Sequence, residues 1–387
     1  MLMVTDRPVQ SRGRLTTRLS SVSEASALNL AQWDELAQLA GEPNAFHEAW
    51  FLGPALTHLR GSRDVWIAEA FDESGALCGL LPLSLEPRYG RVPLRHTSNW
   101  THYQCFMGTP LIVEGAETQF WTALITALDA SDWAVGFLSI SGLLEDGPVH
   151  RGLIAAATAL DRPSPTVHSY DRAALASDIS AGDYLETAVR AKKRKELRRL
   201  ANRLGDEGTV SYSTLEYTEQ LASWCAEFLA LESAGWKGAR GAALGNAPET
   251  AAFFTEIVRG AFAAGRLDFQ RLDLDGRAIA MLVNFRTPPG SWSFKIAYDE
   301  GLARFSPGVL IELDNLARVL SDPALDWMDS CAVENHPMID RLWMERRRII
   351  QVSVPLAGTS RRLTYKAARA AETGSASLRR LLRREAW

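Results

Sequence analysis

The pattern of apolar and polar residues predicts the same order of strands and helices in each half of this chain. Residues 65–87, VWIAEAFDESGALCGLLPLSLEP, are two strand-like runs joined by an Asp-Glu-Ser-Gly turn, which is typical of a β-hairpin. Residues 266–286 repeat this plan around an Asp-Gly turn, so that Gly75 and Gly276 occupy equivalent positions. A helix and a further strand follow each hairpin, predicted at 118–129 and 133–140 in the first half and at 306–320 and 325–332 in the second. The pattern predicts an α/β protein with two similar lobes in tandem.

The remaining segments suggest where the lobes begin and end. The first twenty residues are polar and rich in Arg and Ser, which indicates a loose arm or a first edge strand. Helices are predicted at 28–39 and 45–59, and two prolines among small polar residues place a lobe boundary near residue 165. We expect an arm at 1–20, a first lobe at 21–165, a second lobe at 166–355 with a basic helix at 184–204, and a basic tail at 356–387 of two short helical pieces.

Composition and charge narrow the class of protein. The 387 residues are 47% hydrophobic and carry a net charge of −4, so the chain as a whole has no electrostatic case for nucleic acid. The four cysteines are far apart, without metal-binding or CxxC spacing, which fits a reduced compartment and predicts no metal. No signal-peptide pattern and no long uncharged apolar run occur. We therefore expect a cytoplasmic location, with peripheral association at the inner membrane face left open.

The segment from residue 291 to residue 320 has the strongest indication of a ligand site. The residues WSFKIAY predict a strand that ends at Asp299, Glu300 and Gly301. Apolar residues at helical spacing follow from Val309. Ser306 fits a helix N-cap and Pro307 fits the first helical position. A helix that begins there could bind an anion such as a pyrophosphate with its free N–H groups.

Several segments carry a more specific resemblance, which covers about residues 20–355. KKRKELRRLANRLG, FLALESAGWKGARGAAL, IAMLVNF, FKIAYDEGLARFSPGVLI and DRLWMERRRI together resemble the GNAT-like family called CelD/BcsL, associated with exopolysaccharide and cellulose loci. The repeated lobe is also similar to the Fem peptidyltransferases. The resemblance implies two tandem GNAT-like lobes with mixed central sheets and a basic helical insertion. It also implies transfer of an acyl group from acetyl-CoA or another acyl-CoA to an amine of a small or glycan-linked substrate.

The same resemblance assigns the donor site, with one departure. The family's pyrophosphate loop follows Arg/Gln-x-x-Gly-x-Gly/Ala, and the equivalent residues here are Arg304, Phe305, Ser306 and Gly308, with a single glycine. Pro307 removes one N–H donor from this loop. A donor held differently, or a donor other than CoA, therefore remains an alternative.

Candidate catalytic residues lie at the strand end and in the first lobe. Asp299 or Glu300 could accept a proton and Tyr298 could protonate the leaving thiolate, although the two carboxylates could equally cap a turn. His102, in the polar and aromatic loop HTSNWTHYQCFMGTPL, is the candidate base from the first lobe, with a capped loop histidine as the alternative.

Three further residues are candidates for substrate binding. Trp236 and Lys237 lie between glycines in a predicted loop, where Gly235 could end the preceding helix in the left-handed conformation. Trp236 could contact a sugar or adenine, or fill the core beneath the loop. Lys295 could line the cleft or lie at a strand edge.

The basic helix at 184–204 carries eight Lys and Arg residues, which indicates an anionic partner: a phosphate donor, an acidic glycan, tRNA or a lipid surface. The predicted activity is acyl-CoA-dependent N-acyl transfer, on an amine of a polysaccharide or envelope precursor. A Fem-like transferase that uses aminoacyl-tRNA is one alternative. The other is a non-catalytic GNAT-like subunit of a polysaccharide-synthesis system.

Overall fold

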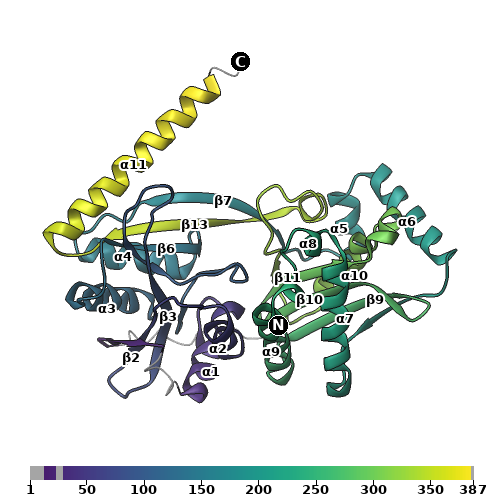
Figure 1. Ribbon diagram of the computed structural model, residues 1–387, viewed down its shortest axis with the longest axis horizontal. Helices are drawn as coiled ribbons and strands as arrows, with labels where there is room; N and C mark the ends of the chain where they lie inside the picture. Colours follow the sequence, from purple (N-terminus) through teal and green to yellow (C-terminus); the bar gives the residue numbers. More distant parts are fainter. Residues whose placement is uncertain (1–12, 23–28, 385–387) are drawn as a thin grey trace. The chain divides into compact units, whose positions relative to one another are not determined.

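A computed structural model describes residues 13–22 and 29–384, with side chains to residue 373 (Figure 1). The chain forms two compact units, here called unit 1 and unit 2. Unit 1 contains residues 1–49, 62–170 and 348–387, and unit 2 contains residues 50–61 and 171–347. Strands β7 (Thr166–Leu175) and β13 (Glu345–Pro355) each contribute residues to both units.

Unit 1 is built around a mixed sheet with the strand order β1-β2-β3-β4-β6-β13, and the short β5 pairs with β3. Its other elements are β1 (Thr16–Ser21), α1 (Leu30–Leu39), the 3-10 turn η2 (Ala45–His47), β2 (Val65–Phe71), β3 (Leu77–Glu86), β4 (His96–Asn99), β5 (Leu111–Ile112), α3 (Glu117–Ala130), β6 (Phe137–Leu144), α4 (Pro148–Ala159) and α11 (Thr359–Arg384). Helix α2 (Ala49–His58) begins in unit 1 and continues in unit 2.

Unit 2 has the strand order β7-β12-β11-β10-β9-β8. Its elements are α5 (Ala181–Ala188), α6 (Ala191–Gly205), β8 (Val210–Thr214), η3 (Thr218–Gln220), α7 (Leu221–Ala234), α8 (Trp236–Ala239), η4 (Leu244–Asn246), α9 (Pro248–Ala263), β9 (Leu267–Leu274), β10 (Arg277–Thr287), β11 (Gly290–Tyr298), η5 (Glu300–Phe305), α10 (Pro307–Ser321), β12 (Trp327–Asp329) and η6 (Ile339–Arg341).

The two units have the same topology, which confirms the predicted repeat of the lobes. In unit 1 an antiparallel β2-β3-β4 meander leads through α3 to β6, which is parallel to β4. In unit 2 the antiparallel β9-β10-β11 meander leads through α10 to β12, which is parallel to β11. Each sheet is extended by an antiparallel strand next to the parallel one, β13 beside β6 and β7 beside β12. The fold is therefore mixed α/β, and its two halves follow one plan.

Opposite faces of the unit 2 sheet pack against different helices, as the alternation of strand side chains requires. Leu282 of β10 packs on one face with Ile311 of α10 and Leu204 of α6. Phe285 of β10 packs on the other face with Phe294 of β11 and Phe51 of α2. Helices α7 and α9 contact the sheet as well.

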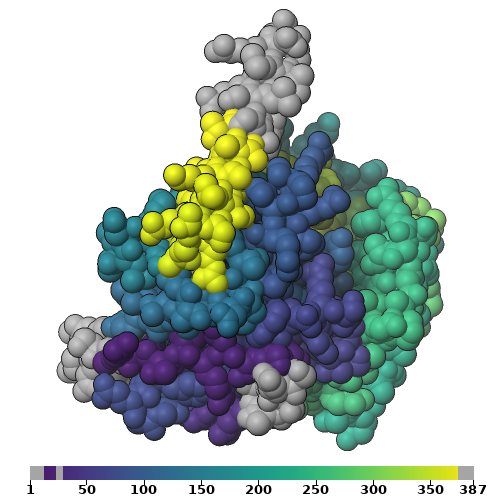
Figure 2. Space-filling model, turned by 60° about the vertical axis from the view of Figure 1, so that its left-hand side comes forward, coloured from purple at the N-terminus to yellow at the C-terminus, as the bar shows by residue number. Residues whose placement is uncertain are grey.

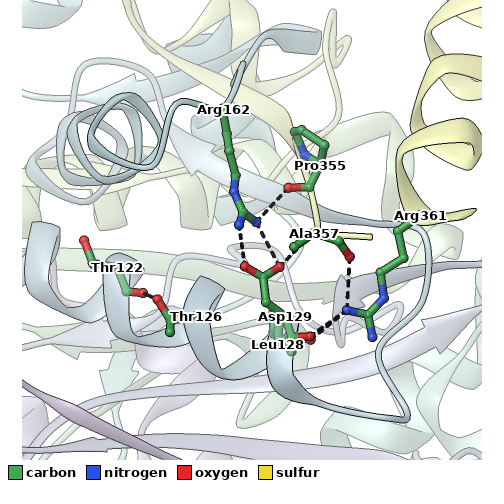
Figure 3. Close-up of polar contacts among 8 residues, drawn as sticks. All are labelled: Thr122, Thr126, Leu128, Asp129, Arg162, Pro355, Ala357 and Arg361. Atoms are coloured by element: carbon green, nitrogen blue, oxygen red, sulfur yellow. Dashed lines mark hydrogen bonds and ion pairs between the residues drawn. The ribbon is translucent and has the colours of Figure 1, made fainter. Parts of the chain in front are cut away.

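In unit 1 the base of the C-terminal helix is fixed by an aspartate and two arginines (Figure 3). Asp129 accepts hydrogen bonds from Arg162 and from the Ala357 N–H, the latter at 2.7 Å. Arg361 of α11 donates to the Asp129 carbonyl at 2.9 Å and to the Ser131 and Ala134 carbonyls. The first turns of α11, shown in yellow in Figure 2, therefore lie against this unit.

Several predicted element bounds are corrected by the structure. The helix expected at 45–59 is the turn η2 followed by α2, because the Asn44 side chain caps the Phe46 N–H. The segment around residue 165 continues into strand β7. The strand expected at 133–140 is β6, at residues 137–144. The strand expected at 325–332 ends at Asp329, since Cys331 has the left-handed φ of 53°.

The basic segments also differ from the prediction. The single helix expected at 184–204 is α5 and α6, interrupted where Val189 adopts an extended conformation and its side chain enters the core. The two pieces expected in the tail are one helix, α11. Of the predicted arm, residues 1–12 lie outside the described residues, whereas Thr16–Ser21 form the edge strand β1. The predicted domain bounds themselves stay a prediction, because compact units need not coincide with lobes.

Candidate active site at the end of strand β11

Strands β11 and β12 pair only over a short distance. Residues Gly290, Ser291 and Trp292 of β11 pair with β12, whereas β10 pairs with β11 as far as Tyr298. Among the described strands, β10 is thus the only partner of β11 over residues 293–298. The β10–β11 register also shifts between Val283 and Asn284. The second half of β11 therefore has main-chain groups directed away from β10 that other groups can bind.

One of these main-chain groups already has a ligand, the ammonium of Lys237. Its Nζ donates to the Ile296 carbonyl at 2.9 Å and to Glu232 Oε1 at 3.0 Å. Glu232 is buried and also accepts the Leu244 N–H at 2.8 Å. Lys295 lies nearby on β11, where burial, followed by the charge of Lys237, lowers its pKa to about 8. The second half of β11 thus has two lysines, one of which is partly neutral slightly above neutral pH.

Helix α10 begins directly beside Tyr298. Pro307 is its first residue, as predicted, but Ser306 has a left-handed φ of 55° and its side chain makes no capping hydrogen bond. The Val309 and Leu310 N–H groups both donate to the Ser306 carbonyl. Since Pro307 has no N–H, Gly308 is the remaining donor of this first turn. A Cβ at Gly308 would lie 3.1 Å from Tyr298 Cδ1, so the tyrosine ring lies against the first turn of the helix.

The two carboxylates that follow β11 both have structural partners. Asp299 accepts the Gly301 N–H at 2.9 Å and pairs with Arg277 at 2.7 Å. Glu300 accepts the Trp236 N–H at 2.6 Å. The capping role that the sequence left open is therefore present, and their role in proton transfer stays a prediction.

Trp236 lies in a short helix rather than in the predicted loop. It begins α8, and the preceding Gly235 has a φ of −90°, so the expected left-handed helix end is wrong. The Trp236 ring is 48% exposed, with the Arg240 guanidinium 5.2 Å from its centroid. The alternative in which this tryptophan fills the core is excluded by that exposure.

Arg304 and Phe305 lie in η5, which connects β11 to α10 in the sequence. Phe305 is fully buried in the core of unit 2, so its side chain supports the loop from inside. Arg304 is exposed, lies 4.5 Å from the Phe305 centroid and pairs with Glu207 at 3.5 Å. Of this predicted donor loop, Arg304 is thus exposed, whereas Gly308 is buried beside Tyr298.

His102 lies in unit 1, apart from the other candidates in the chain. Burial, followed by the charge of His47, lowers the pKa of His102 to about 3. Its Nδ1 accepts the Gln104 N–H at 3.3 Å. An imidazole with so low a pKa is a weak proton acceptor near neutral pH, which does not favour the predicted role as a base.

The structure contains two buried polar clusters that were not predicted from the sequence. Asp329, at the end of β12, pairs with Arg172 at 2.9 Å and with Arg347 at 3.3 Å, and Arg347 lies 4.0 Å from the centroid of Trp327. Within the described residues no group of His, Cys, Asp and Glu could hold a metal ion.

The second cluster is centred on Glu312 of α10, where burial raises the pKa to about 8. Asn315 donates to Glu312 at 3.1 Å and accepts from Asn284 at 2.9 Å. Glu232 and Glu312 share one signal in the sequence: each is a carboxylate at helical spacing with buried apolar residues of its own helix.

An antiparallel meander, a helix that begins beside the end of its last strand, and a parallel strand that diverges from it form a GNAT-like α/β fold. Residues 191–332 match the family model of the acetyltransferase (GNAT) domain. No curated protein matches the sequence. Among the described residues, no helix is both long enough and apolar enough to cross a membrane.

Solved structures with the same fold cover most of this chain. FemX is 9% identical with a TM-score of 0.54, over 84% of this chain and 96% of that one. A protein of unknown function from Bacteroides thetaiotaomicron is 12% identical with a TM-score of 0.54, over 84% and 98%. The C-terminal domain of a putative lysylphosphatidylglycerol synthetase from Agrobacterium fabrum is 11% identical with a TM-score of 0.52, over 84% and 91%. At these identities the likeness concerns the fold.

Proposed function

We propose that the protein transfers an acyl group from acyl-CoA to an amine, with the reaction at the end of β11. The supporting observation is an arrangement within the residues that match the GNAT model: β11 extends beyond its pairing with β12, and its last residue, Tyr298, lies beside the N-terminus of α10. The Gly308 N–H and the helix dipole would bind the donor pyrophosphate, with Arg304 contributing positive charge. The acceptor would be an amine of a polysaccharide or envelope precursor, a proposal that rests on the resemblance of the sequence segments.

In this proposal the strand end holds the groups that move protons. The attacking amine must lose a proton and the departing thiolate must gain one. Lys295, Asp299 and Glu300 lie on or beside β11 for the first step, and Tyr298 for the second. Trp236, exposed beside Lys237, would contact the acceptor or the adenine of the donor.

Calorimetric titration with acetyl-CoA tests the donor site, using Gly308→Asp, Gly308→Ala and the control Gly205→Asp. Gly308→Asp places a carboxylate beside the pyrophosphate, and we expect at least a tenfold loss of affinity, about 1.4 kcal/mol. Gly308→Ala adds only a methyl group against Tyr298, so its loss should be smaller. Gly205 is exposed and a Cβ there has no neighbours, so its variant should bind like the parent.

Equal CoA affinity in a folded Gly308→Asp protein would reject this site. Absence of CoA binding by the parent itself would leave two functions. A transferase that uses aminoacyl-tRNA is favoured by the fold shared with FemX and by the exposed cations of α6, and it requires tRNA binding in a parallel titration. Binding of neither donor would indicate a non-catalytic GNAT-like subunit.

A further inference from the structure

Unit 2 contains a cavity on one flank of helix α10. It has a volume of about 560 Å³, within the range of small-molecule sites, and lies among α5, α6, α10 and β8. Most of its wall is aliphatic, and this part consists of Leu185, Val189, Leu197, Ala201, Leu310, Leu313 and Ala317. A cavity with this wall suits a hydrocarbon chain better than a sugar or a nucleotide.

The charged residues that line the cavity balance formally, but Arg318, outside the lining, pairs with Asp314 and leaves an excess of one positive charge. Arg194 and Arg198 belong to its lining, with Glu186 and Asp314 as the acidic members. Asp314 forms a salt bridge with Arg318 at 2.5 Å, which balances the charge of this carboxylate. Arg194 is held in place by hydrogen bonds from its guanidinium to the carbonyls of Glu186 and Val189 at 2.8 and 2.6 Å. An anionic headgroup is therefore the complement of this rim.

Helix α6 carries more exposed positive charges than a single anionic headgroup in the cavity could contact. Helix α6 turns Leu197, Leu200 and Leu204 inward, and its exposed cations are Lys192, Lys193, Lys195, Arg198, Arg199 and Arg203. Only Lys193 among them is paired with a carboxylate of the same helix, Glu196, at 3.2 Å. Basic residues close to an anionic bilayer contribute about 1 kcal/mol each. An extended anionic surface, rather than one soluble ligand, matches this row of charges.

We propose that α6 docks on an anionic phospholipid bilayer and that the α5–α6–α10 cavity receives a hydrocarbon chain of one of its lipids. The phosphate of that lipid lies at Arg194 and Arg198, and the remaining cations of α6 face neighbouring headgroups. A single chain combined with a basic patch provides two signals, which together give stable membrane attachment. This site is independent of the proposed acyl transfer.

Co-sedimentation with vesicles tests the proposal on the full-length protein. We expect binding to vesicles of phosphatidylglycerol in phosphatidylcholine and not to phosphatidylcholine alone. Leu313→Trp and Ala317→Trp each fill the cavity and should weaken binding at least tenfold at high salt, where surface charge is screened. Tyr217→Trp adds an indole at an exposed position of unit 2 and is the matched control. Dodecyl phosphate should compete for the protein, whereas inorganic phosphate should not.

Three results would overturn the proposal. Folded Leu313→Trp and Ala317→Trp proteins that bind vesicles like the parent would show that the cavity takes no chain. Binding of dodecyl phosphate without binding of either vesicle would assign the cavity to a soluble amphiphile. Binding of tRNA in preference to phosphatidylglycerol vesicles would assign the cations of α6 to RNA.

Discussion

Replacement of Asp329 by asparagine tests the buried ion cluster at the end of β12. Asp329 has an exposed fraction of 0% and Arg172 one of 2%, and their side chains meet at 2.9 and 3.1 Å. Asparagine keeps the size of the side chain and can still accept the Cys331 N–H, which Asp329 Oδ1 accepts at 2.8 Å. The substitution therefore removes the negative charge and leaves the Arg172 guanidinium buried beside a neutral group.

Removal of one partner from a buried ion pair costs about 3–5 kcal/mol, because the remaining charge has lost its compensation. Asp329 and Arg172 both belong to unit 2, which falls in the size range of about 150–250 residues. For a domain of that size, each kcal/mol of lost unfolding free energy lowers Tm by about 2–4 °C, so the expected decrease is roughly 6–20 °C. The assay is urea and thermal unfolding followed by circular dichroism. Asp326→Asn, at an exposed aspartate just before β12, should change the free energy of unfolding by less than about 0.5 kcal/mol.

Two outcomes would refute the reasoning. A folded Asp329→Asn protein as stable as Asp326→Asn would show that Arg172 has other compensation. The double variant Arg172→Met with Asp329→Asn should be less destabilised than the sum of the single variants, because the uncompensated guanidinium is gone. Strict additivity would exclude the pairing as the cause.

Two further predictions concern pH and turnover. Because burial raises the pKa of Glu312 to about 8, the folded state holds a proton that the unfolded state loses above about 4.5, so this group lowers stability as pH rises to 8. Glu312→Gln should therefore match the parent near pH 4 and exceed it increasingly up to pH 8 in urea unfolding; a constant difference would contradict this. Tyr298→Phe or Glu300→Gln should reduce kcat by about 10²–10⁴ with CoA affinity retained. If both keep the parent kcat, the proton transfer takes place elsewhere.

Local signals were sufficient for most of the strands and helices. The turns at Gly75 and Gly276 predicted both hairpins, since each glycine has a positive φ that other residues rarely adopt. Pro307 likewise fixed the start of α10. Prediction failed where tertiary packing opposes the local pattern. Burial of the Val189 side chain divides the basic helix, and β7, whose first half is polar, pairs with β12 at Ala174 and Leu175.

The candidate site was predicted in part. The sequence placed Tyr298, Asp299 and Gly308 at one strand–helix junction, and the structure brings Tyr298 and Gly308 into contact. The sequence did not reveal that Asp299 pairs with Arg277 or that Glu300 accepts the Trp236 N–H at the start of α8, because these partners are distant in sequence. It also missed Glu232, which binds Lys237 beside β11.

The sequence by itself determined the order of elements, the repeat of the lobes and the position of the strand–helix junction, because turns, periodicity and helix starts depend on neighbouring residues. Only the tertiary structure decided which charges are buried together. Arg172 and Asp329 are 157 positions apart, and their free energy depends on the exclusion of water around both. The pKa values of Lys295, Glu312 and His102 were decided in the same way, because each is set first by burial, which the local sequence does not specify.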